Sequence, residues 1–206
     1  MNLPVKAVIS MLKIHALPLG AYQTNTYIVH KPNSQECVII DAGYEPGTIL
    51  DTLESLGLTA EAILLTHGHF DHVGAVRPLA AELECPVYLC ADDLSMPPMM
   101  TAGPLYYTNT YGEGSRLTLA GLDISVLHTP GHTPGSVCLL IENAMFSGDT
   151  LFAGSCGRTD LPGGSWPQIQ QSLHRLSQIE ADFEVYPGHG GSSTLAREKM
   201  TNPYLR

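Results

Sequence analysis

A dense run of metal-binding residue types lies in the first half of the chain, where Thr66–His72 is THGHFDH. His67 and His69 are two positions apart in an expected extended turn, so both rings can face one cation. Asp71 and His72 stand where a helix is expected to begin and can address a second point about 3.5–4 Å away, the spacing of two-metal sites. The pattern therefore predicts a metal site.

Three later turns each present one further residue of the same kinds. His132 lies in TPGHTPG, Asp149 follows an apolar strand in FSGDT, and His189 lies in YPGHG. With the first run they supply five imidazoles and two carboxylates, enough for two borderline metal ions such as zinc. Four histidines lie outside these motifs and are interpreted as ordinary residues: His15, His30, His128 and His174.

Composition narrows the class of protein. The 206 residues are 44% hydrophobic, which suits one large domain with a substantial core. The formal charge of −10 argues against a nucleic-acid partner, because binding the phosphate backbone needs a basic surface. Five cysteines without a repeated spacing indicate reduced thiols. With no apolar run of about 18 residues and no signal peptide at the N-terminus, we expect a cytoplasmic protein that acts on a small molecule; its oligomeric state stays open.

Short apolar strands alternate with helical patterns along most of the chain. The order strand–strand–strand–helix–strand–helix occurs about twice, which predicts an α/β protein with two similar halves and two sheets covered by helices. In the first half we expect strands at 12–17, 26–30, 37–40, 62–65 and 86–89, and helices at 46–56 and 73–84. In the second half we expect strands at 116–119, 123–128, 137–141, 144–147 and 183–186, and helices at 165–177 and 193–200.

The segment 91–114 interrupts this alternation. It is rich in methionine, proline and tyrosine, and it is either a surface excursion with a small apolar plug or an apolar flap over a pocket. We expect it to shape a pocket for an acyl group through Met99, Met100 and Tyr107, because such side chains make adaptable apolar contacts.

The motifs THGHFDH, PGHTPGS, SGDTLF, GSCGRTDLPGGS and VYPGHG resemble those of the metallo-β-lactamase superfamily. Within it they are most similar to short hydrolases of the glyoxalase II (hydroxyacylglutathione hydrolase) type. The resemblance runs in the expected order from Asp41 to His189. It implies a four-layer αββα sandwich, formed by residues 1–206 as a single domain, with the metals at one edge between the sheets. The helical C-terminal domain that carries basic glutathione-binding residues is not expected.

The resemblance also implies roles for the motif residues. Two divalent metals are expected, zinc first, with iron or manganese as alternatives. Asp71 and Asp149 are the expected catalytic carboxylates. Asp149 would bridge the two metals, and Asp41 would orient the metal-binding loop from outside it. The implied ligands are His67, His69 and His132 for the first metal and Asp71, His72 and His189 for the second.

The implied reaction is hydrolysis of a thioester of the hydroxyacylglutathione type through a metal-bound hydroxide. Two alternatives stay open. A persulfide dioxygenase with one iron has a similar scaffold, and Cys156 in GSCGRTD matches its pattern; a metal-binding relative without activity is the other. Arg158 is expected to pair with Asp160 in a structural role.

Other relatives are discounted on single features. Flavodiiron proteins have a glutamate at the position of His69, and β-lactamases lack the aspartate at the position of Asp149. Nuclease members need additional basic domains, and this chain has neither the length nor the charge for them.

Overall fold

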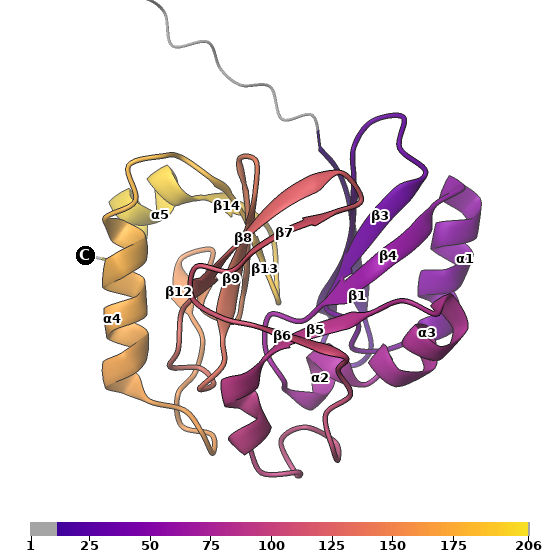
Figure 1. Cartoon of the computed structure of the whole chain (residues 1–206). Coiled ribbons are helices and arrows are strands. Elements are labelled where there is room, and N and C mark those ends of the chain that lie inside the picture. The colour runs from indigo at the N-terminus through magenta and orange to yellow at the C-terminus, as the bar shows by residue number, and fades with distance from the viewer. Residues whose placement is uncertain (1–11, 206) are drawn as a thin grey trace, which may run out of the picture.

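Two six-stranded sheets face each other, and helices cover their outer faces (Figure 1). The computed structural model describes residues 12–205, so the N-terminal stretch in which no signal peptide is expected lies mostly outside the described residues. Helices α1 and α3 cover the first sheet, and α4 and α5 cover the second (Figure 1). The predicted αββα sandwich is therefore confirmed.

The first sheet has the strand order β1-β2-β3-β4-β5-β6. The first three strands form an antiparallel meander, and β3 to β6 run parallel. A parallel neighbour needs a crossover, which α1 (Pro46–Leu56) and α3 (Val76–Leu83) provide. The strands are β1 (Lys13–Leu19), β2 (Thr24–His30), β3 (Glu36–Ile40), β4 (Thr59–Leu64), β5 (Val87–Cys90) and β6 (Asn109–Tyr111).

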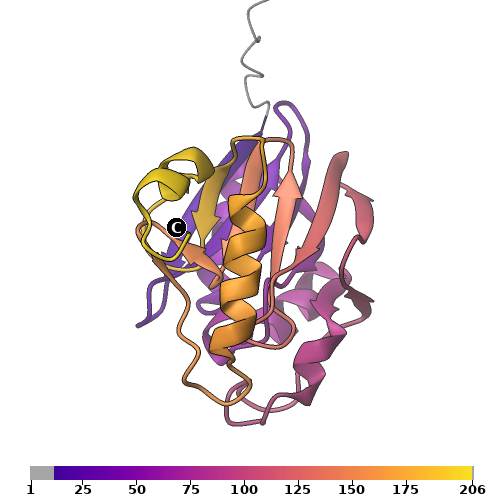
Figure 2. The same cartoon turned by 90° about the vertical axis from the view of Figure 1, so that its left-hand side faces the viewer.

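The second sheet repeats this plan with the order β14-β13-β10-β9-β8-β7. Strands β7 to β10 form an antiparallel meander, and α4 (Trp166–Ser177) then leads to β13, which is parallel to β10. Figure 2 shows α4 lying along the outer face of this sheet. The strands are β7 (Arg116–Leu119), β8 (Leu122–His128), β9 (Val137–Ile141), β10 (Ala144–Gly148), β13 (Glu184–Pro187) and β14 (Ser193–Thr194), with α5 (Leu195–Thr201) following.

Strand alternation divides the apolar side chains between the layers. In β3, Val38 and Ile40 join the core between the two sheets, whereas Ile39 packs with the helices of the first sheet. On the other side, Ile169 and Leu173 of α4 pack against the outer face of the second sheet. Strands buried on both faces need an unbroken apolar run, which explains residues 37–40 of β3 and 62–64 of β4.

One edge of the sandwich collects the strand ends that carry the predicted site. Strand β4 leads into the THGHFDH loop and the short helix α2 (Phe70–Val73), and β3 ends just before Asp41. In the second sheet, β8, β10 and β13 all run the same way and end at this edge. Open α/β sheets bind ligands at the carboxyl ends of their strands.

Four local expectations need correction. The helix predicted at 73–84 begins only at Val76, as α3, after the separate short helix α2. Between the two helices the Ala75 amide donates to the Ala42 carbonyl oxygen, and Gly74 packs so close to Gly43 that an added Cβ would lie 2.5 Å from its carbonyl oxygen. The closing helix begins only at Leu195, after the short strand β14. The excursion contains the 3-10 helix η1 (Ala91–Ser95) and the edge strand β6. A small hairpin, β11 (Leu151–Phe152) and β12 (Ser155–Cys156), was not predicted.

Two expectations from composition can be compared with the structure. All five cysteines fall within residues 12–205, and each is free. No helix in that range combines the length and the apolar character needed to cross a membrane.

Candidate metal centre

The structure brings all seven predicted metal-binding side chains together at the edge where the sheets meet. His67, His69, Asp71 and His72 come from the loop and helix after β4. The other three come from the ends of separate elements of the second sheet: His132 after β8, Asp149 after β10 and His189 after β13. Six of the seven are buried, and His189 is partly exposed.

Three imidazoles form the first group. The ligand atoms of His67, His69 and His132 lie within 4.8 Å of one another. Nδ1 of His69 is 2.8 Å from Nε2 of His132, and the His67 ring packs edge-on against both. The group joins two residues of the first sheet's loop to one of the second. We call it the three-imidazole group.

A second group of ligand atoms within 4.8 Å comprises Asp71, His72 and His189. Oδ2 of Asp71 lies 3.2 Å from Nε2 of His189 and 3.7 Å from Nε2 of His72. Thr24 donates a hydrogen bond of 3.0 Å to the same oxygen. We call this set the carboxylate group.

Asp149 lies between the two groups. Its Oδ1 is 3.4 Å from Nε2 of His72 in the carboxylate group. Its Oδ2 is 3.4 Å from Nε2 of His132 and 3.5 Å from Nε2 of His189. One carboxylate therefore faces both groups, which is the placement a bridging ligand requires.

The far ring nitrogen of four imidazoles is held by the surrounding chain. Nδ1 of His72 lies 2.8 Å from Oδ2 of Asp41, and Nδ1 of His67 lies 3.1 Å from the Thr66 hydroxyl. Two backbone oxygens serve the others: that of Arg158 is 2.7 Å from Nδ1 of His132, and that of Tyr22 is 3.2 Å from Nδ1 of His189. A carbonyl only accepts, so Nδ1 carries the hydrogen and Nε2 presents its lone pair to the centre.

The donor set fits divalent metal ions. In the described part of the chain, the buried atoms without a hydrogen-bond partner include Nε2 of His67, His72 and His69, and Oδ1 of Asp149. Buried polar atoms are normally satisfied, so such a concentration at one point needs an explanation. Imidazole nitrogens and carboxylate oxygens that face each other with free lone pairs are the ligands that zinc and iron accept.

The pKa values of the buried histidines shift in opposite directions in the two groups. Burial, with help from neighbouring imidazoles, holds the pKa of His67 well below its usual value and lowers that of His69 to about 4. Burial also opposes charge on His72, but the carboxylates of Asp41 and Asp149 raise its pKa well above the usual value. For Asp149, burial is outweighed by the imidazoles around it, so its pKa is lowered and it stays ionised. Such perturbed pKa values are typical of functional sites.

Two backbone features fix this geometry locally. Asp41 has a left-handed backbone conformation with a φ of 55°, which is uncommon for a residue other than glycine. This turn lets its carboxylate accept hydrogen bonds from the Thr66 amide, at 2.8 Å, and hydroxyl, at 2.7 Å. The contact expected of Asp41 with the metal-binding loop is thus confirmed. Gly188 must be glycine, because a Cβ there would collide with Asp149 Oδ1 and with His72.

A pocket of about 520 Å³ opens onto the centre. Its polar floor includes His69, Asp71, His132, Asp149 and His189. Apolar side chains form much of its wall: Tyr22, Phe70, Met100, Phe152 and Leu161. A concave apolar site with a few convergent polar groups is the usual form of a small-molecule site.

The excursion contributes to this pocket through one of the three expected residues. Met100 lines the pocket and is buried. Met99 is 79% exposed and Tyr107 is 39% exposed, and neither is among the lining residues. The prediction was therefore wrong for Met99 and Tyr107, because successive residues of an irregular turn point in different directions.

Two further residues of the pocket wall are Cys156 and Arg158. The Arg158 guanidinium makes two hydrogen bonds of 2.7 Å to Asp160, so the predicted pairing is confirmed. The thiol of Cys156 is half-buried, and burial raises its pKa, which keeps it protonated and unreactive at neutral pH.

Some contributors to the centre were not predicted. Asp93 of η1 is fully buried against both ligand-bearing loops, and Thr24 holds Asp71. The backbone oxygens that orient His132 and His189 belong to Arg158 and Tyr22. Backbone oxygens carry no residue-type signal, and the adjacent Asp92 has the same residue type as Asp93, so the sequence does not distinguish the two.

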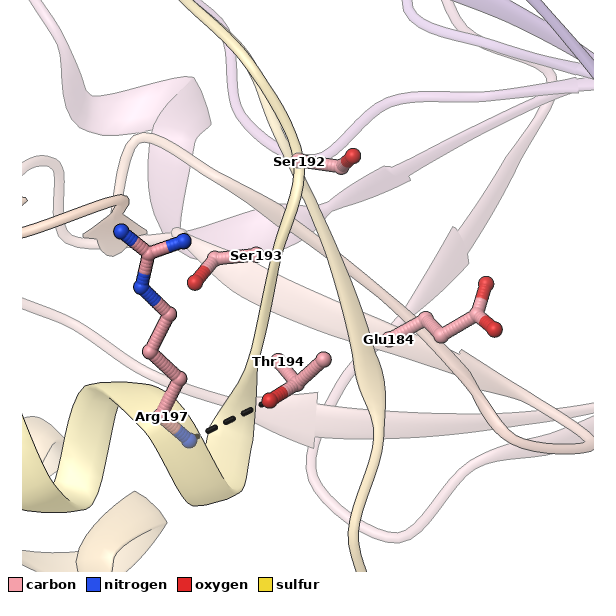
Figure 3. A pocket seen from close by; sticks show the side chains of 5 residues that line it. All are labelled: Glu184, Ser192, Ser193, Thr194 and Arg197. Carbon is pink, nitrogen blue, oxygen red and sulfur yellow. Dashed lines mark hydrogen bonds between the residues drawn. The ribbon is translucent and has the colours of Figure 1, made fainter.

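Two other features lack comparable chemistry. A pocket of about 310 Å³ beside β13 and β14 has Arg197 and Glu184 extending to opposite sides and serines and a threonine between them (Figure 3). Cys90, Asp92 and His128 also have ligand atoms within 4.8 Å. Nε2 of His128, however, already lies 2.8 Å from the Pro134 carbonyl oxygen, so this nitrogen is occupied.

An αββα sandwich with five imidazoles and two carboxylates at one edge is typical of a class of metal-dependent enzymes. The family model of the metallo-beta-lactamase superfamily matches residues 19–189, and the chain belongs to this superfamily. Members bind divalent metals and most are hydrolytic enzymes. The resemblance predicted from the motifs is confirmed.

Among curated proteins, the chain is 31% identical to hydroxyacylglutathione hydrolase GloC of Haemophilus influenzae, over 94% of this chain and 98% of that protein. Three solved structures are also similar. That of TTHA1623 in a di-iron-bound form has a TM-score of 0.82 and 41% identity, covering 93% of this chain and 100% of the other. That of ETHE1 from Myxococcus xanthus has a TM-score of 0.78 and 28% identity, covering 93% of this chain and 83% of the other.

The third structure is that of BLEG-1, a B3 metallo-beta-lactamase, with a TM-score of 0.84 and 36% identity, covering 94% of this chain and 99% of the other. So close a likeness to a β-lactamase does not support the expectation that this class is excluded. The di-iron relative likewise shows that zinc is not the only metal found in similar proteins.

Proposed function

We propose that this protein hydrolyses small thioesters with two divalent metal ions, zinc in the first place. The observation that carries the proposal is the convergence of seven metal-binding side chains at one edge of the sandwich. Four of their ligand atoms are buried without a hydrogen-bond partner, and five of the seven side chains line one pocket. The likeness to a hydroxyacylglutathione hydrolase over nearly the whole of both chains supports the thioester. Bound divalent ions would supply a nucleophile from water at neutral pH and would polarise the substrate carbonyl.

The ligands follow the two groups. His67, His69 and His132 would hold one ion, and Asp71, His72 and His189 the other. Asp149 would be shared, because its carboxylate lies near His132 of the three-imidazole group and near His72 and His189 of the carboxylate group. Arg158 and Tyr22 act through their backbone oxygens, which keep His132 and His189 in the tautomer that can bind.

Asp71 and Asp149 are the carboxylates that we assign to catalysis. Both border the pocket, and both have a lowered pKa, so they are ionised at neutral pH despite burial. Asp149 would balance the positive charge in the centre of the site. Asp71, held by Thr24, borders the pocket and would orient a water molecule there.

The pocket wall favours a compact, largely apolar acyl group. Tyr22 and Phe70 pack edge to face, with ring centroids 5.4 Å apart, at the pocket. Apart from histidines, Arg158 is the only cationic residue among the described residues that line the pocket, and Asp160 already neutralises it. Glutathione brings two carboxylates that would find few partners here. Its thioesters should therefore bind weakly.

We propose that the substrate is a small molecule of the cytoplasm. A nucleic acid is not the proposed partner, because the protein carries a net negative charge.

The test combines metal analysis with a substrate panel. Protein purified without added metal should contain close to two metal ions per chain. It should hydrolyse a neutral acyl thioester, lose this activity to a chelator and regain it with zinc. Lactoyl-glutathione should show a raised KM with a similar kcat, because uniform binding of the distant thiol portion is lost.

A second candidate, the persulfide dioxygenase, is favoured by Cys156 in the pocket wall and by the likeness to ETHE1. Oxygen uptake with glutathione persulfide, supported by one iron per chain and without thioester turnover, would establish it in place of the hydrolase. A chromogenic β-lactam belongs in the same panel, because of the likeness to BLEG-1. Full metal occupancy without turnover of any of these substrates would indicate a metal-binding relative without activity.

A further inference from the structure

Asp93 is a buried carboxylate to which neither the motifs nor the family resemblance assigns a role. It lies in η1, at the start of the excursion, and its exposed fraction is zero. Oδ2 accepts a hydrogen bond of 2.7 Å from the Gly68 amide and one of 3.1 Å from the Thr133 hydroxyl. Oδ1 accepts one of 2.6 Å from the Gly135 amide.

These partners belong to the two loops that make the three-imidazole group. Gly68 stands between His67 and His69 on the loop after β4. Thr133 follows His132 directly on the loop after β8, and Gly135 is two residues further on. Asp93 therefore links the loop of the first sheet to the loop of the second, at the point where their imidazoles meet.

The space around Asp93 leaves little freedom. A Cβ on Gly135 would lie 2.7 Å from Cγ of Asp93, so the loop can approach only because residue 135 is glycine. On the other loop, a Cβ on Gly68 would lie 3.0 Å from Met96 and from Leu105, two residues of the excursion. The excursion thus packs directly on the loop of His67 and His69.

The hydrogen bonds also require a carboxylate. Two of the three partners are backbone amides, which only donate, and the Thr133 hydroxyl donates as well. An ionised aspartate offers acceptors alone, whereas asparagine would turn an amide group toward at least one donor. A buried mismatch of this kind would push the two loops apart.

We propose that Asp93 is a positioning residue that sets the distance between His67, His69 and His132, and so determines the affinity of the three-imidazole group for metal. Asp41 stands on the other side, at the end of β3, and contacts Thr66 and His72. The metal-binding loop after β4 is thus held by an aspartate at the end of each neighbouring strand. The proposal rests on the metal-binding part of the proposed function and is independent of the substrate.

The test is zinc affinity, measured by chelator competition on metal-free protein. In a His189→Ala background, which keeps the three-imidazole group, Asp93→Asn should weaken the remaining zinc by about 10–100-fold, the usual effect of a residue that orients ligands. Asp92→Asn is the matched control, since Asp92 is the exposed neighbour on the same turn. It should change the affinity by less than about twofold.

Thr133 keeps the proposal testable if Asp93→Asn does not fold. Thr133→Val removes one donor to Asp93 and should lower zinc affinity severalfold, whereas Thr133→Ser keeps the hydroxyl and should restore it. A merely structural role would lower the melting temperature of the metal-free protein and leave the affinity unchanged. Unchanged zinc affinity in Asp93→Asn, or in Thr133→Val where the aspartate variant does not fold, would overturn the proposal.

Discussion

The first sheet places four of the seven candidate ligands on one loop and helix, whereas the second sheet delivers three from three separate strand ends. On the first loop, neighbouring residues share their supports, because Asp41 holds both Thr66 and His72. In the second half each ligand has its own support, such as the Arg158 carbonyl for His132. Ligands from the first half are therefore coupled to each other, and those from the second half are more independent.

Asp149 should be the most damaging position, because its carboxylate faces both groups. We expect Asp149→Asn to reduce turnover on the order of a thousandfold and to lower the occupancy of both metals, since a neutral amide bridges two dications poorly. Metal analysis and thioester turnover are the measurements. Two tightly bound metals and normal turnover in this variant would show that Asp149 does not bridge.

Single-ligand variants compare the two halves directly. His67→Ala and His189→Ala should each lose one metal and lower kcat/KM by about a hundredfold or more, because each ion supplies several kcal/mol of charge stabilisation. His67→Ala should also weaken the second metal, since His67 shares a cluster with His72 and Asp149. His189→Ala should leave the three-imidazole group intact. Equal losses of both metals in the two variants would remove the proposed difference between the halves.

Met100 and Met99 are a matched pair for the role of the excursion. Met100→Ala should shift the ratio of kcat/KM between a long and a short acyl chain by two- to tenfold, since each buried methylene is worth about 0.8 kcal/mol. Met99→Ala, at an exposed neighbour, should leave that ratio unchanged. Kinetics on a series of acyl thioesters measures both. If the two variants behave alike, the excursion does not set the acyl preference.

The smallest effect is expected at a surface ion pair between the excursion and the second half. Arg175 of α4 donates to Glu113, and this hydrogen bond lowers the Glu113 pKa. The pair's contribution is present above the pKa of the carboxyl in the unfolded chain and is lost as the pH falls through the lower folded value. We expect Glu113→Gln to cost about 0.2–1 kcal/mol at pH 7, because both side chains are solvent-exposed.

Thermal unfolding of the metal-free protein, compared between wild type and Glu113→Gln at pH 7 and pH 4, checks this sign. The difference between the two proteins should narrow toward acid. A difference that grows as the pH falls would contradict the assigned direction of the pKa shift.

Much of the fold could be predicted because local signals agree with the tertiary structure. Helix α1 occupies 46–56, as predicted: Pro46 suits a first helical position, and Gly57 adopts the left-handed conformation that ends the helix. Strands β7 and β9 also have the predicted bounds, because a turn closes each of them. The later start of the helix predicted at 73–84 was missed, since the Gly74 backbone there packs against Gly43, a contact that no local pattern encodes.

The candidate site was predictable where residue type carries the chemistry. Histidines at close spacing and at strand ends were found in this way, and the structure brings them together. Asp92 and Asp93 are chemically identical and adjacent in sequence, yet one is exposed and the other is fully buried. Only the packing of two loops around Asp93 distinguishes them, so the sequence alone could not assign the role.

The shared position of the metal centre, between two sheets that each have their own helices, has a consequence for the integrity of the fold. The five cysteines are free, so no disulfide among residues 12–205 joins the halves. Metal ions held by ligands from both sheets would act as a cross-link between them. A ligand that binds only the folded state at a hundred times its Kd adds about 2.7 kcal/mol of stability. Metal supply would thus govern the lifetime of the protein as well as its activity.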